Sequence, residues 1–278
     1  MIFYKLCDIL DYFYYIVVKF MMCAHKPLLF IILSLAIIAP SAYAQKIVLV
    51  GLAHFPPFIE AREQKIGGLA ADMLQLMNQH QNKYIFKGIP TLANTRHKIF
   101  GLGRYDMSMF DNLAWGWSDY EVDASEVFLS GGEVYIAKVK PGRDESYFKS
   151  FKNKTMIGIK GYHYKFADFN ADEVFLASNF NMQLTKSNTG SITMLLSGNR
   201  GDIAVVSKSF LAQYFNQHPQ ARQQILVSKK IDQAYNHSII IRKGIKPSID
   251  EINHILKALN QNGKLPKLWR QIAPDSIY

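Results

Sequence analysis

Two strand-like segments, far apart in the chain, constrain the fold most. The first is GGEVYIAKV at residues 131–139, and the second is HSIIIRKG at residues 237–244. Alternating strand-like and helix-like segments precede the first and fill the interval to the second. If the chain leaves one lobe through the first segment and returns through the second, the two segments form a hinge. The sequence therefore predicts an α/β protein of two lobes, with two crossover hinge strands and a ligand cleft between the lobes.

The part before the hinge has a β-α-β-α-β order. Short hydrophobic runs at 46–52, 84–89 and 105–110 predict strands. Helical patterns begin near Gly68 and near Asn94, which is expected to cap the second helix. This order favours parallel strands, and ligands collect at the carboxyl ends of parallel strands.

The pattern restarts after the first hinge segment. Near the end of the chain, Ser248 and Glu251 form a capping box, and Gly263 is the expected stop of that helix. Strands are predicted at 156–159, 172–177 and 202–206, and a short helix is predicted at 191–196.

The first 44 residues have the pattern of a cleaved secretory signal peptide. Lys26 precedes an uncharged hydrophobic run at 28–39, and residues 42–44 have the A-x-A form of a cleavage site. The mature chain is therefore expected to begin at Gln45 and to reside in the periplasm.

Residues ahead of this signal are expected to be absent from the mature protein. A second hydrophobic stretch at 1–20 is interpreted as the product of a misassigned start codon, with initiation at Met21 or Met22. Both cysteines, Cys7 and Cys23, precede the cleavage site. The mature protein is thus expected to contain no disulfide and no thiol chemistry.

The chain is basic, but its charges are scattered. Removing the signal changes the count of Lys and Arg from 32 to 29 and that of Asp and Glu from 22 to 20, which leaves a formal charge of +9. The densest basic cluster, at 138–165, is interpreted as a solvated lobe face. No nucleic acid partner is expected.

Short motifs along residues 46–273 follow the order of a known family. They include FPPF at 55–58, GRYD at 103–106, KTMIGIKG at 154–161 and GNRGDIAVV at 198–206. Together they resemble the bacterial extracellular solute-binding proteins of family three, the polar amino acid type periplasmic receptors of ABC importers. The resemblance implies a type II periplasmic-binding-protein-like fold that closes on a small polar solute.

The sequence departs from that family where the family holds its ligand. The resemblance implies an Arg for the ligand carboxylate shortly after the third strand, and the corresponding position holds Ser118. The family's Asp for the ligand amine corresponds to Ser207. The identity of the solute therefore does not follow from the resemblance.

Candidate site residues follow the predicted strands. Aromatic side chains offer flat apolar surface, and a cationic ligand can stack on Trp115. Arg96 can bind a carboxylate of the ligand, and Asp111 can bind an amine or hydroxyl groups. The backbone N–H groups at Gly161 can bind an anion. The expected ligand-binding residues are Phe55, Arg96, Asp111, Asn112, Trp115, Trp117, Gly161, Tyr162, His163, Ser207 and Tyr235.

Structural roles are the alternative for several of these candidates. Core or hinge packing is the alternative for the aromatic residues and is favoured for Phe58. A surface arginine that pairs with Asp or Glu is the alternative for Arg96. Asp111 and Asn112 can be plain turn residues, and His163 can be a surface histidine.

Enzymatic functions find little support in the sequence. It contains no H-E-x-x-H, G-x-S-x-G or P-loop motif, and its acidic run at 119–126 is interpreted as a solvated loop. No catalytic residue, metal ion or cofactor is expected.

We expect a monomer with lobe one at 45–134 and 238–278 and lobe two at 135–237. It would capture an amino acid or a related compound by hinge closure and deliver it to an ABC permease in the inner membrane. Two alternatives stay open: a sensory ligand-binding module that docks on a receptor, and a dehydratase-like enzyme on the same scaffold.

Overall fold

The structure is a computed structural model that describes residues 19, 44–62, 65–197 and 200–272. The chain divides into two compact units, Met1–Ala44 and Gln45–Tyr278. The predicted signal peptide and start sites lie outside the described residues, except for Lys19 and Ala44. The description below concerns the second unit. Among the described residues, no helix combines the length and the hydrophobicity needed to cross a membrane.

A nine-stranded sheet runs through this unit. Its strands follow the order β4-β1-β5-β11-β7-β10-β8-β9, and β6 pairs with β11 beside this path. Strands β2 and β3 form a separate antiparallel pair. The strands are β1 Lys46–Ala53, β2 Glu60–Arg62, β3 Lys65–Gly67, β4 Tyr84–Thr91, β5 Met107–Asp111, β6 Val122–Ala124, β7 Leu129–Lys138, β8 Met156–Ile159, β9 Met182–Thr185, β10 Ile203–Ser207 and β11 Ile225–Arg242.

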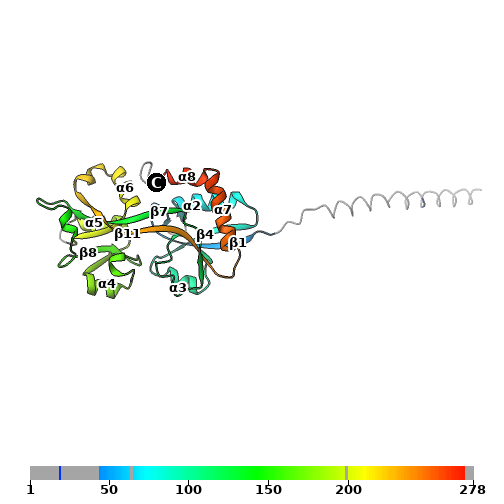
Figure 1. Ribbon diagram of the computed structural model, residues 1–278, viewed down its shortest axis with the longest axis horizontal. Coiled ribbons are helices and arrows are strands. Elements are labelled where there is room, and N and C mark those ends of the chain that lie inside the picture. The colour runs from blue at the N-terminus through cyan, green and yellow to red at the C-terminus, as the bar shows by residue number, and fades with distance from the viewer. Residues whose placement is uncertain (1–18, 20–43, 63–64, 198–199, 273–278) are drawn as a thin grey trace, which may run out of the picture. The chain divides into compact units, whose positions relative to one another are not determined.

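The helices gather in two groups along this sheet. Figure 1 shows α2, α3, α7 and α8 around the half that holds β1 and β4, and α4, α5 and α6 around the half that holds β8. We call these the first and the second lobe. The helices are α2 Leu69–His80, α3 Arg96–Gly101, α4 Glu173–Phe180, α5 Asn188–Leu196, α6 Lys208–Gln217, α7 Ile249–Gln261 and α8 Lys264–Trp269, and short 3₁₀ helices span Glu145–Phe148, Lys165–Ala167 and Pro219–Gln223.

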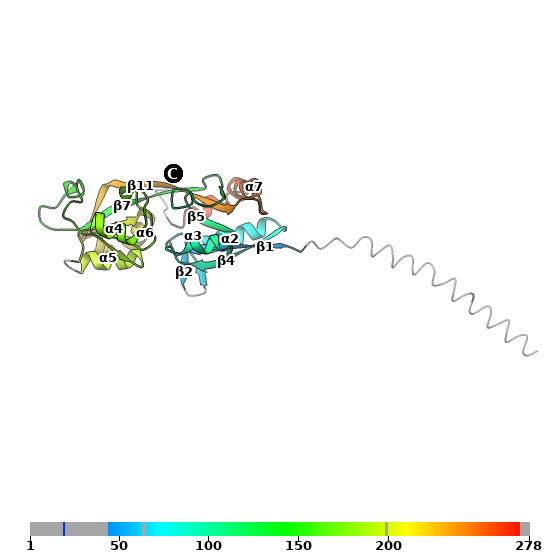
Figure 2. The same ribbon diagram turned by 90° about the horizontal axis from the view of Figure 1, so that it is seen from below.

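Strands β7 and β11 cross between the lobes. They pair antiparallel from Leu129 opposite His237 to Lys138 opposite Ile225. Figures 1 and 2 show both strands running side by side from one lobe into the other. The fold class predicted from the sequence, two α/β lobes with two crossing strands, is therefore confirmed. The return strand is longer than predicted, because β11 begins at Ile225.

Parallel pairing builds the rest of both lobes. Strand β1 pairs in parallel with β4 and β5, and β8 pairs in parallel with β9 and β10. All residues of β5 and of β10 are buried. Full burial is expected for parallel strands that are covered on both faces.

Each lobe has its own hydrophobic core. In the first lobe, Val50, Met73 and Leu256 belong to one buried cluster. In the second lobe, Ile136 and Ile157 belong to another. The crossing strands β7 and β11 are the element that the two lobes share.

Two predictions of secondary structure were wrong. Residues 172–177 were predicted as a strand, but Asp172 caps α4 by accepting a hydrogen bond from the Phe175 N–H, with Oδ1 and N 2.8 Å apart. A short apolar run fits a helix and a strand equally well, and the cap decides between them. Thr95, and not Asn94, occupies the N-cap of α3, and it makes no side-chain capping bond.

The last long helix follows its sequence signals. Ser248 and Glu251 form the predicted capping box at the start of α7. Gly263 follows this helix with φ 74°, in the left-handed region that favours glycine at a helix end.

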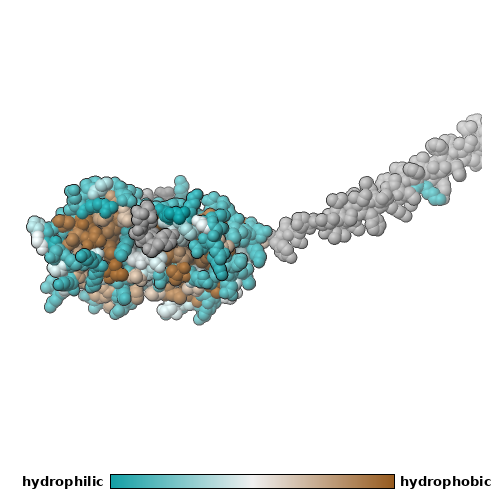
Figure 3. All heavy atoms as spheres, turned by 45° about the horizontal axis from the view of Figure 1, so that its top comes forward, coloured by the Kyte–Doolittle hydropathy of each residue, from teal (hydrophilic) through white to brown (hydrophobic). Residues whose placement is uncertain are grey.

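Polar and apolar residues both reach the exterior. Figure 3 shows hydrophilic residues over much of the face it presents and hydrophobic residues gathered on both lobes. Leu92, Leu102, Leu113 and Val174 are among the exposed large hydrophobic side chains. Folded proteins usually expose part of their apolar surface.

Candidate functional site

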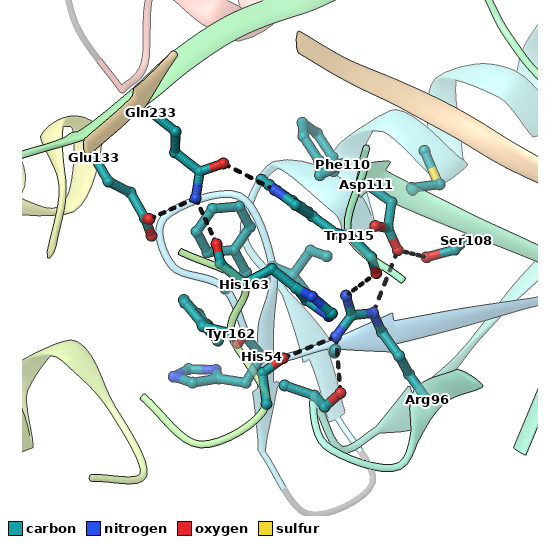
Figure 4. Close-up of a pocket in the computed structure, with 16 residues that line it drawn as sticks. His54, Arg96, Ser108, Phe110, Asp111, Trp115, Glu133, Tyr162, His163 and Gln233 are labelled. Carbon is teal, nitrogen blue, oxygen red and sulfur yellow. Dashed lines mark hydrogen bonds and ion pairs between the residues drawn. The ribbon is translucent and has the colours of Figure 1, made fainter. Parts of the chain in front are cut away.

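A cavity of about 50 Å³ lies between the lobes, at the carboxyl ends of β1 and β5. Its position agrees with the rule for ligand sites in parallel sheets. Figure 4 shows charged, polar and aromatic side chains converging on it from both lobes. The lining residues are Ala53, His54, Phe55, Ile59, Ala93, Arg96, Ser108, Met109, Phe110, Asp111, Trp115, Glu133, Gly161, Tyr162, His163 and Gln233.

A buried ion pair forms the first-lobe wall of the cavity. Arg96, the first residue of α3, is 6% exposed, and Asp111, the last residue of β5, is 4% exposed. Arg96 Nε lies 3.6 Å from Asp111 Oδ2. The carboxylate also accepts hydrogen bonds from the Ser108 hydroxyl and the Asn112 N–H, both at 2.9 Å. These bonds fix the carboxylate in place and compensate for its burial.

The Arg96 guanidinium reaches across to the second lobe. Its Nη1 donates to the carbonyl oxygens of Ala93, at 2.8 Å, and of Gly161, at 3.1 Å. Its Nη2 donates to the carbonyl oxygen of Trp115 at 3.1 Å. The sequence predicted that Arg96 holds a ligand carboxylate with two hydrogen bonds. In the structure, protein acceptors engage all three guanidinium nitrogens.

The backbones of the two lobes come close at Gly161. This residue has φ 80°, and a Cβ built on it would overlap the backbone of Asn94. Only glycine fits both the conformation and the space. Next to it, the Tyr162 hydroxyl donates to the carbonyl oxygen of His54 with a distance of 3.0 Å. Two adjacent residues of the second lobe therefore rest on the first.

An irregularity in β5 aligns two polar side chains toward the cavity. In β11, Ser238 and Ile240 pair with Asp111 and Ser108, so β5 has one more residue than β11 over this interval. Phe110 within it has φ 53°. Ser108 and Asp111 are three positions apart and would face opposite sides of a regular strand. The extra residue lets them meet on one side, as the hydrogen bond between them shows.

Glu133 is a buried acid on the crossing strand β7. It is 3% exposed, and its Oε2 accepts a hydrogen bond from Gln233 Nε2 at 2.8 Å. Burial raises the pKa of Glu133 to about 8, and the negative charge of Asp232 adds to the rise. Burial without a partner of opposite charge disfavours the ionised form of an acid.

The amide of Gln233 connects three walls of the cavity. Its Nε2 donates to Glu133 and also to the carbonyl oxygen of His163 at 2.6 Å. Its Oε1 accepts from the indole Nε1 of Trp115 at 3.0 Å. Figure 4 shows this amide between Glu133 and Trp115.

Two histidines meet at the interface of the lobes. The rings of His97, from α3, and His163, from the second lobe, have centroids 5.8 Å apart. Burial and the charge of Arg96 lower the pKa of His97 to about 3 and that of His163 to about 4. His163 Nδ1 lies 2.7 Å from the carbonyl oxygen of Phe169. The neutral ring therefore carries its proton on Nδ1 and donates it to that oxygen.

Aromatic rings form the remaining wall. The ring of Phe55 contacts those of Trp115 and Tyr162 edge to face. Its centroid lies 5.9 Å from the Trp115 centroid and 5.5 Å from the Tyr162 centroid. Phe58 lies behind Phe55 and is fully buried, as the alternative of core packing predicted. This wall gives the cavity the flat apolar surface expected from the sequence.

Seven of the predicted site residues line the cavity. They are Phe55, Arg96, Asp111, Trp115, Gly161, Tyr162 and His163.

The other four candidates lie outside the lining. Trp117 is 1% exposed and packs against Phe100 in the first-lobe core. Ser207 caps α6 by accepting a hydrogen bond from the Phe210 N–H. Tyr235 packs behind Trp115, with centroids 5.1 Å apart, and Asn112 shapes the turn after β5 by accepting a bond from the Ala114 N–H. Packing and capping account for their positions.

Four polar lining residues are not among the predicted site residues. They are His54, Ser108, Glu133 and Gln233. Glu133 did carry a signal, since it is a lone acid in the otherwise apolar segment 131–137 of a buried strand. Ser108 depends on the irregularity in β5, and Gln233 lies in a stretch where β11 shifts register. Strand periodicity cannot find residues that depend on such shifts.

Comparison with solved structures reveals close similarity in fold. A mutant of the arginine-binding protein ArgBP from T. maritima matches with a TM-score of 0.64 and 18% identity, over 82% of this chain and 96% of that chain. The protein has the fold of amino-acid-binding proteins. The expectation drawn from the sequence resemblance is confirmed at this level.

Two further structures agree. The substrate-binding protein of an amino acid ABC transporter matches with a TM-score of 0.61 and 19% identity, over 82% of this chain and 100% of that chain. The ancestral amino acid-binding protein AncCDT-1, a precursor of cyclohexadienyl dehydratase, matches with a TM-score of 0.61 and 17% identity, over 81% and 95%. No family model and no curated protein sequence matches the chain.

The described residues offer no metal centre. Among them, no group of three or more His, Cys, Asp or Glu side chains is arranged to hold a metal ion. The polar groups of the cavity are suited to hydrogen bonding and charge pairing with a small solute.

Proposed function

We propose that the protein is a solute-binding protein that captures a small polar solute by closing its two lobes. The observation that carries this proposal is the cavity between the lobes, whose lining combines an ion pair, a buried acid and an aromatic wall. Residues of both lobes contribute to it, so a solute bound there contacts both. Such contacts favour the closed arrangement over an open one.

The contacts between the lobes support closure as the mechanism. Arg96 and Tyr162 make hydrogen bonds from one lobe to backbone oxygens of the other. A cavity of about 50 Å³ holds roughly four water molecules. A larger solute therefore enters by moving the lobes apart, and closure then withdraws it from bulk water.

The same proposal includes the lobe boundaries, the location and the partner of the protein. The first lobe comprises residues 45–134 and 238–278, and the second lobe comprises residues 135–237. The protein is a periplasmic monomer, and its closed form docks on an ABC permease in the inner membrane. The pattern of a signal peptide at 1–44 supports export. The similarity to ArgBP from T. maritima and to the substrate-binding protein of an amino acid ABC transporter supports transport.

A ligand screen with a structural readout tests the proposal. Amino acids, polyamines and small acids are added to the purified protein, and the melting temperature is measured. A true solute raises the melting temperature and decreases the radius of gyration in small-angle scattering. If no polar solute does either, the binding function is wrong.

Catalysis is the second candidate function. The similarity to a binding protein that is a precursor of a dehydratase favours it, and so does a buried acid with a raised pKa in the cavity. Incubation of the protein with each solute from the screen, followed by mass spectrometry, decides between the two. A product formed in proportion to protein concentration favours an enzyme, and recovery of unchanged solute favours a receptor.

A further inference from the structure

The cavity contains one carboxyl group, that of Glu133, that no cation of its lining balances. Its charged lining residues are Arg96, Asp111 and Glu133, and Arg96 pairs with Asp111. Glu133 has the amide of Gln233 as its partner and lies on the opposite side of the cavity, as Figure 4 shows. A buried carboxylate is stable in its ionised form only beside a positive charge.

Glu133 and a backbone carbonyl group already accept hydrogen bonds from one nitrogen, Nε2 of Gln233. Glu133 Oε2 and the carbonyl oxygen of His163 both accept hydrogen bonds from Gln233 Nε2, at 2.8 Å and 2.6 Å. An ammonium or guanidinium group of a solute has the donors to satisfy both acceptors and adds the missing positive charge. The side chain of Gln233 would turn aside to admit it.

We propose that this cavity selects a small organic cation without a carboxylate group, a primary amine or a guanidinium compound, whose charge contacts Glu133. This inference rests on the solute-binding function proposed above.

The aromatic wall suits the same ligand. Trp115 and Tyr162 flank Phe55 at centroid distances of 5.9 and 5.5 Å. The negative faces of aromatic rings attract cations, and the attraction is strongest where water is excluded.

A carboxylate on the ligand would be disfavoured. The guanidinium nitrogens of Arg96 already have acceptors in Asp111, Ala93, Gly161 and Trp115. A ligand carboxylate would have to displace one of these and would stand near two further carboxyl groups, those of Asp111 and Glu133. Like charges at such a site repel. An amino acid therefore binds less tightly than the amine that lacks its carboxylate.

Matched pairs of compounds test this selection. Ethanolamine and serine, cadaverine and lysine, and agmatine and arginine differ in each pair by one carboxylate group. Each compound is titrated into the purified full-length protein by calorimetry. Ethanolamine suits the existing cavity best, because it has few heavy atoms. We expect the amine of at least one pair to bind at least about tenfold tighter than its amino acid.

Two variants locate the effect at Glu133. Glu133→Gln keeps the shape and the hydrogen-bonding capacity of the side chain and removes its charge. It should weaken binding of the amine at least about 30-fold. The matched control is Glu126→Gln, the same change at an exposed position, which should alter binding by less than about twofold. Melting temperatures of both variants verify that they fold.

The outcomes separate this inference from the function on which it rests. The inference is overturned, and solute binding stays in place, if no amine binds more tightly than its amino acid or if Glu133→Gln binds the amine as well as the unmodified protein does. An amine that binds through Glu133 without decreasing the radius of gyration supports the inference and contradicts lobe closure. Absence of binding by every compound overturns both.

Discussion

Arg96 of the first lobe donates a hydrogen bond to the carbonyl oxygen of Gly161 in the second lobe, with Nη1 and O 3.1 Å apart. Asp111 pairs with the same guanidinium on the first lobe, with Nε and Oδ2 3.6 Å apart. One side chain thus joins a buried charge in the first lobe to the backbone of the second. In the proposed mechanism, closure depends on the ion pair and on the close approach of the backbone at Gly161.

A methyl group at Gly161 should hold the lobes apart. In Gly161→Ala the added Cβ would overlap the backbone of Asn94 in the other lobe. We expect the variant to have a larger radius of gyration in small-angle scattering and at least about tenfold weaker solute binding, because closure loses roughly 1.4 kcal/mol or more.

Gly142→Ala is the matched control for that variant. Gly142 also has a positive φ, 73°, and no atom lies within 4 Å of a Cβ built there. It therefore carries the same backbone strain as Gly161→Ala without the steric overlap. Equal radii of gyration in the two variants would show that the approach at Gly161 does not limit closure.

Loss of the Arg96 charge should destabilise the protein through Asp111. Arg96→Gln leaves a 4% exposed carboxylate without its ion-pair partner. The free energy of unfolding in urea should fall by about 3 kcal/mol.

A double-mutant cycle tests the cause of that loss. Because Asp111→Asn removes the unpaired charge, the double variant should lose less stability than the sum of the single variants, with a coupling energy of about 1–3 kcal/mol. Additive losses would mean that the pair contributes through packing alone.

The Tyr162 hydroxyl should contribute to closure and little to the stability of either lobe. Tyr162→Phe removes the hydrogen bond to the His54 carbonyl oxygen and keeps the ring against Phe55. Solute binding should weaken about three- to tenfold, in line with the net value of one hydrogen bond. Tyr147→Phe, which removes a bond to Asp202 within the second lobe, should leave binding unchanged. Equal effects of both variants would contradict a role of Tyr162 between the lobes.

The sequence predicted the fold better than the site. Hydrophobic periodicity and the capping box at Ser248 depend only on residues that are close together in the sequence. The helix α7 that they predict is present in the structure. The run at 172–177 was misassigned because its periodicity suits both a helix and a strand, and the hydrogen bond from Asp172 became visible only in the structure.

The site was harder to predict because it depends on contacts between distant residues. Trp115 meets Gln233 across 118 positions of sequence, and Arg96 meets Gly161 across 65. Trp117 has the same side chain as Trp115 and lies two positions away, yet it is buried in the core. Residue type and strand order cannot distinguish the two tryptophans, because the turn after β5 sets their directions.

Acid should weaken the protein through its buried histidines. Burial lowers the pKa of His97 and His237 to about 3 and that of His163 to about 4, from an ordinary value of 6.5. The unfolded chain therefore binds more protons than the folded chain between pH 6.5 and pH 4. The stability that these neutral histidines contribute is complete above pH 6.5 and is lost as the pH decreases. Each histidine accounts for up to about 1.4 kcal/mol of the free energy of unfolding per pH unit.

Urea unfolding at pH 7.5, 6 and 5 measures this dependence. His163→Asn removes one of the three histidines and retains an N–H donor near the position of Nδ1 for the Phe169 carbonyl oxygen. Its stability should fall less steeply with acid than that of the unmodified protein. Identical slopes would show that His163 is charged in the folded state or already exposed.

Glu133 should give the opposite dependence on pH. Burial raises its pKa from 4.5 to about 8, so the folded chain retains a proton that the unfolded chain releases between these values. The stability that this group contributes is complete below pH 4.5 and is lost as the pH rises toward 8, by up to about 1.4 kcal/mol per pH unit.

Glu133→Gln cannot ionise, so its advantage over the unmodified protein in the free energy of unfolding should grow between pH 5 and pH 8. Glu126→Gln, the same substitution at an exposed position, is the matched control. A constant difference between Glu133→Gln and the unmodified protein over this range would mean that Glu133 is already ionised in the folded state, beside a positive charge.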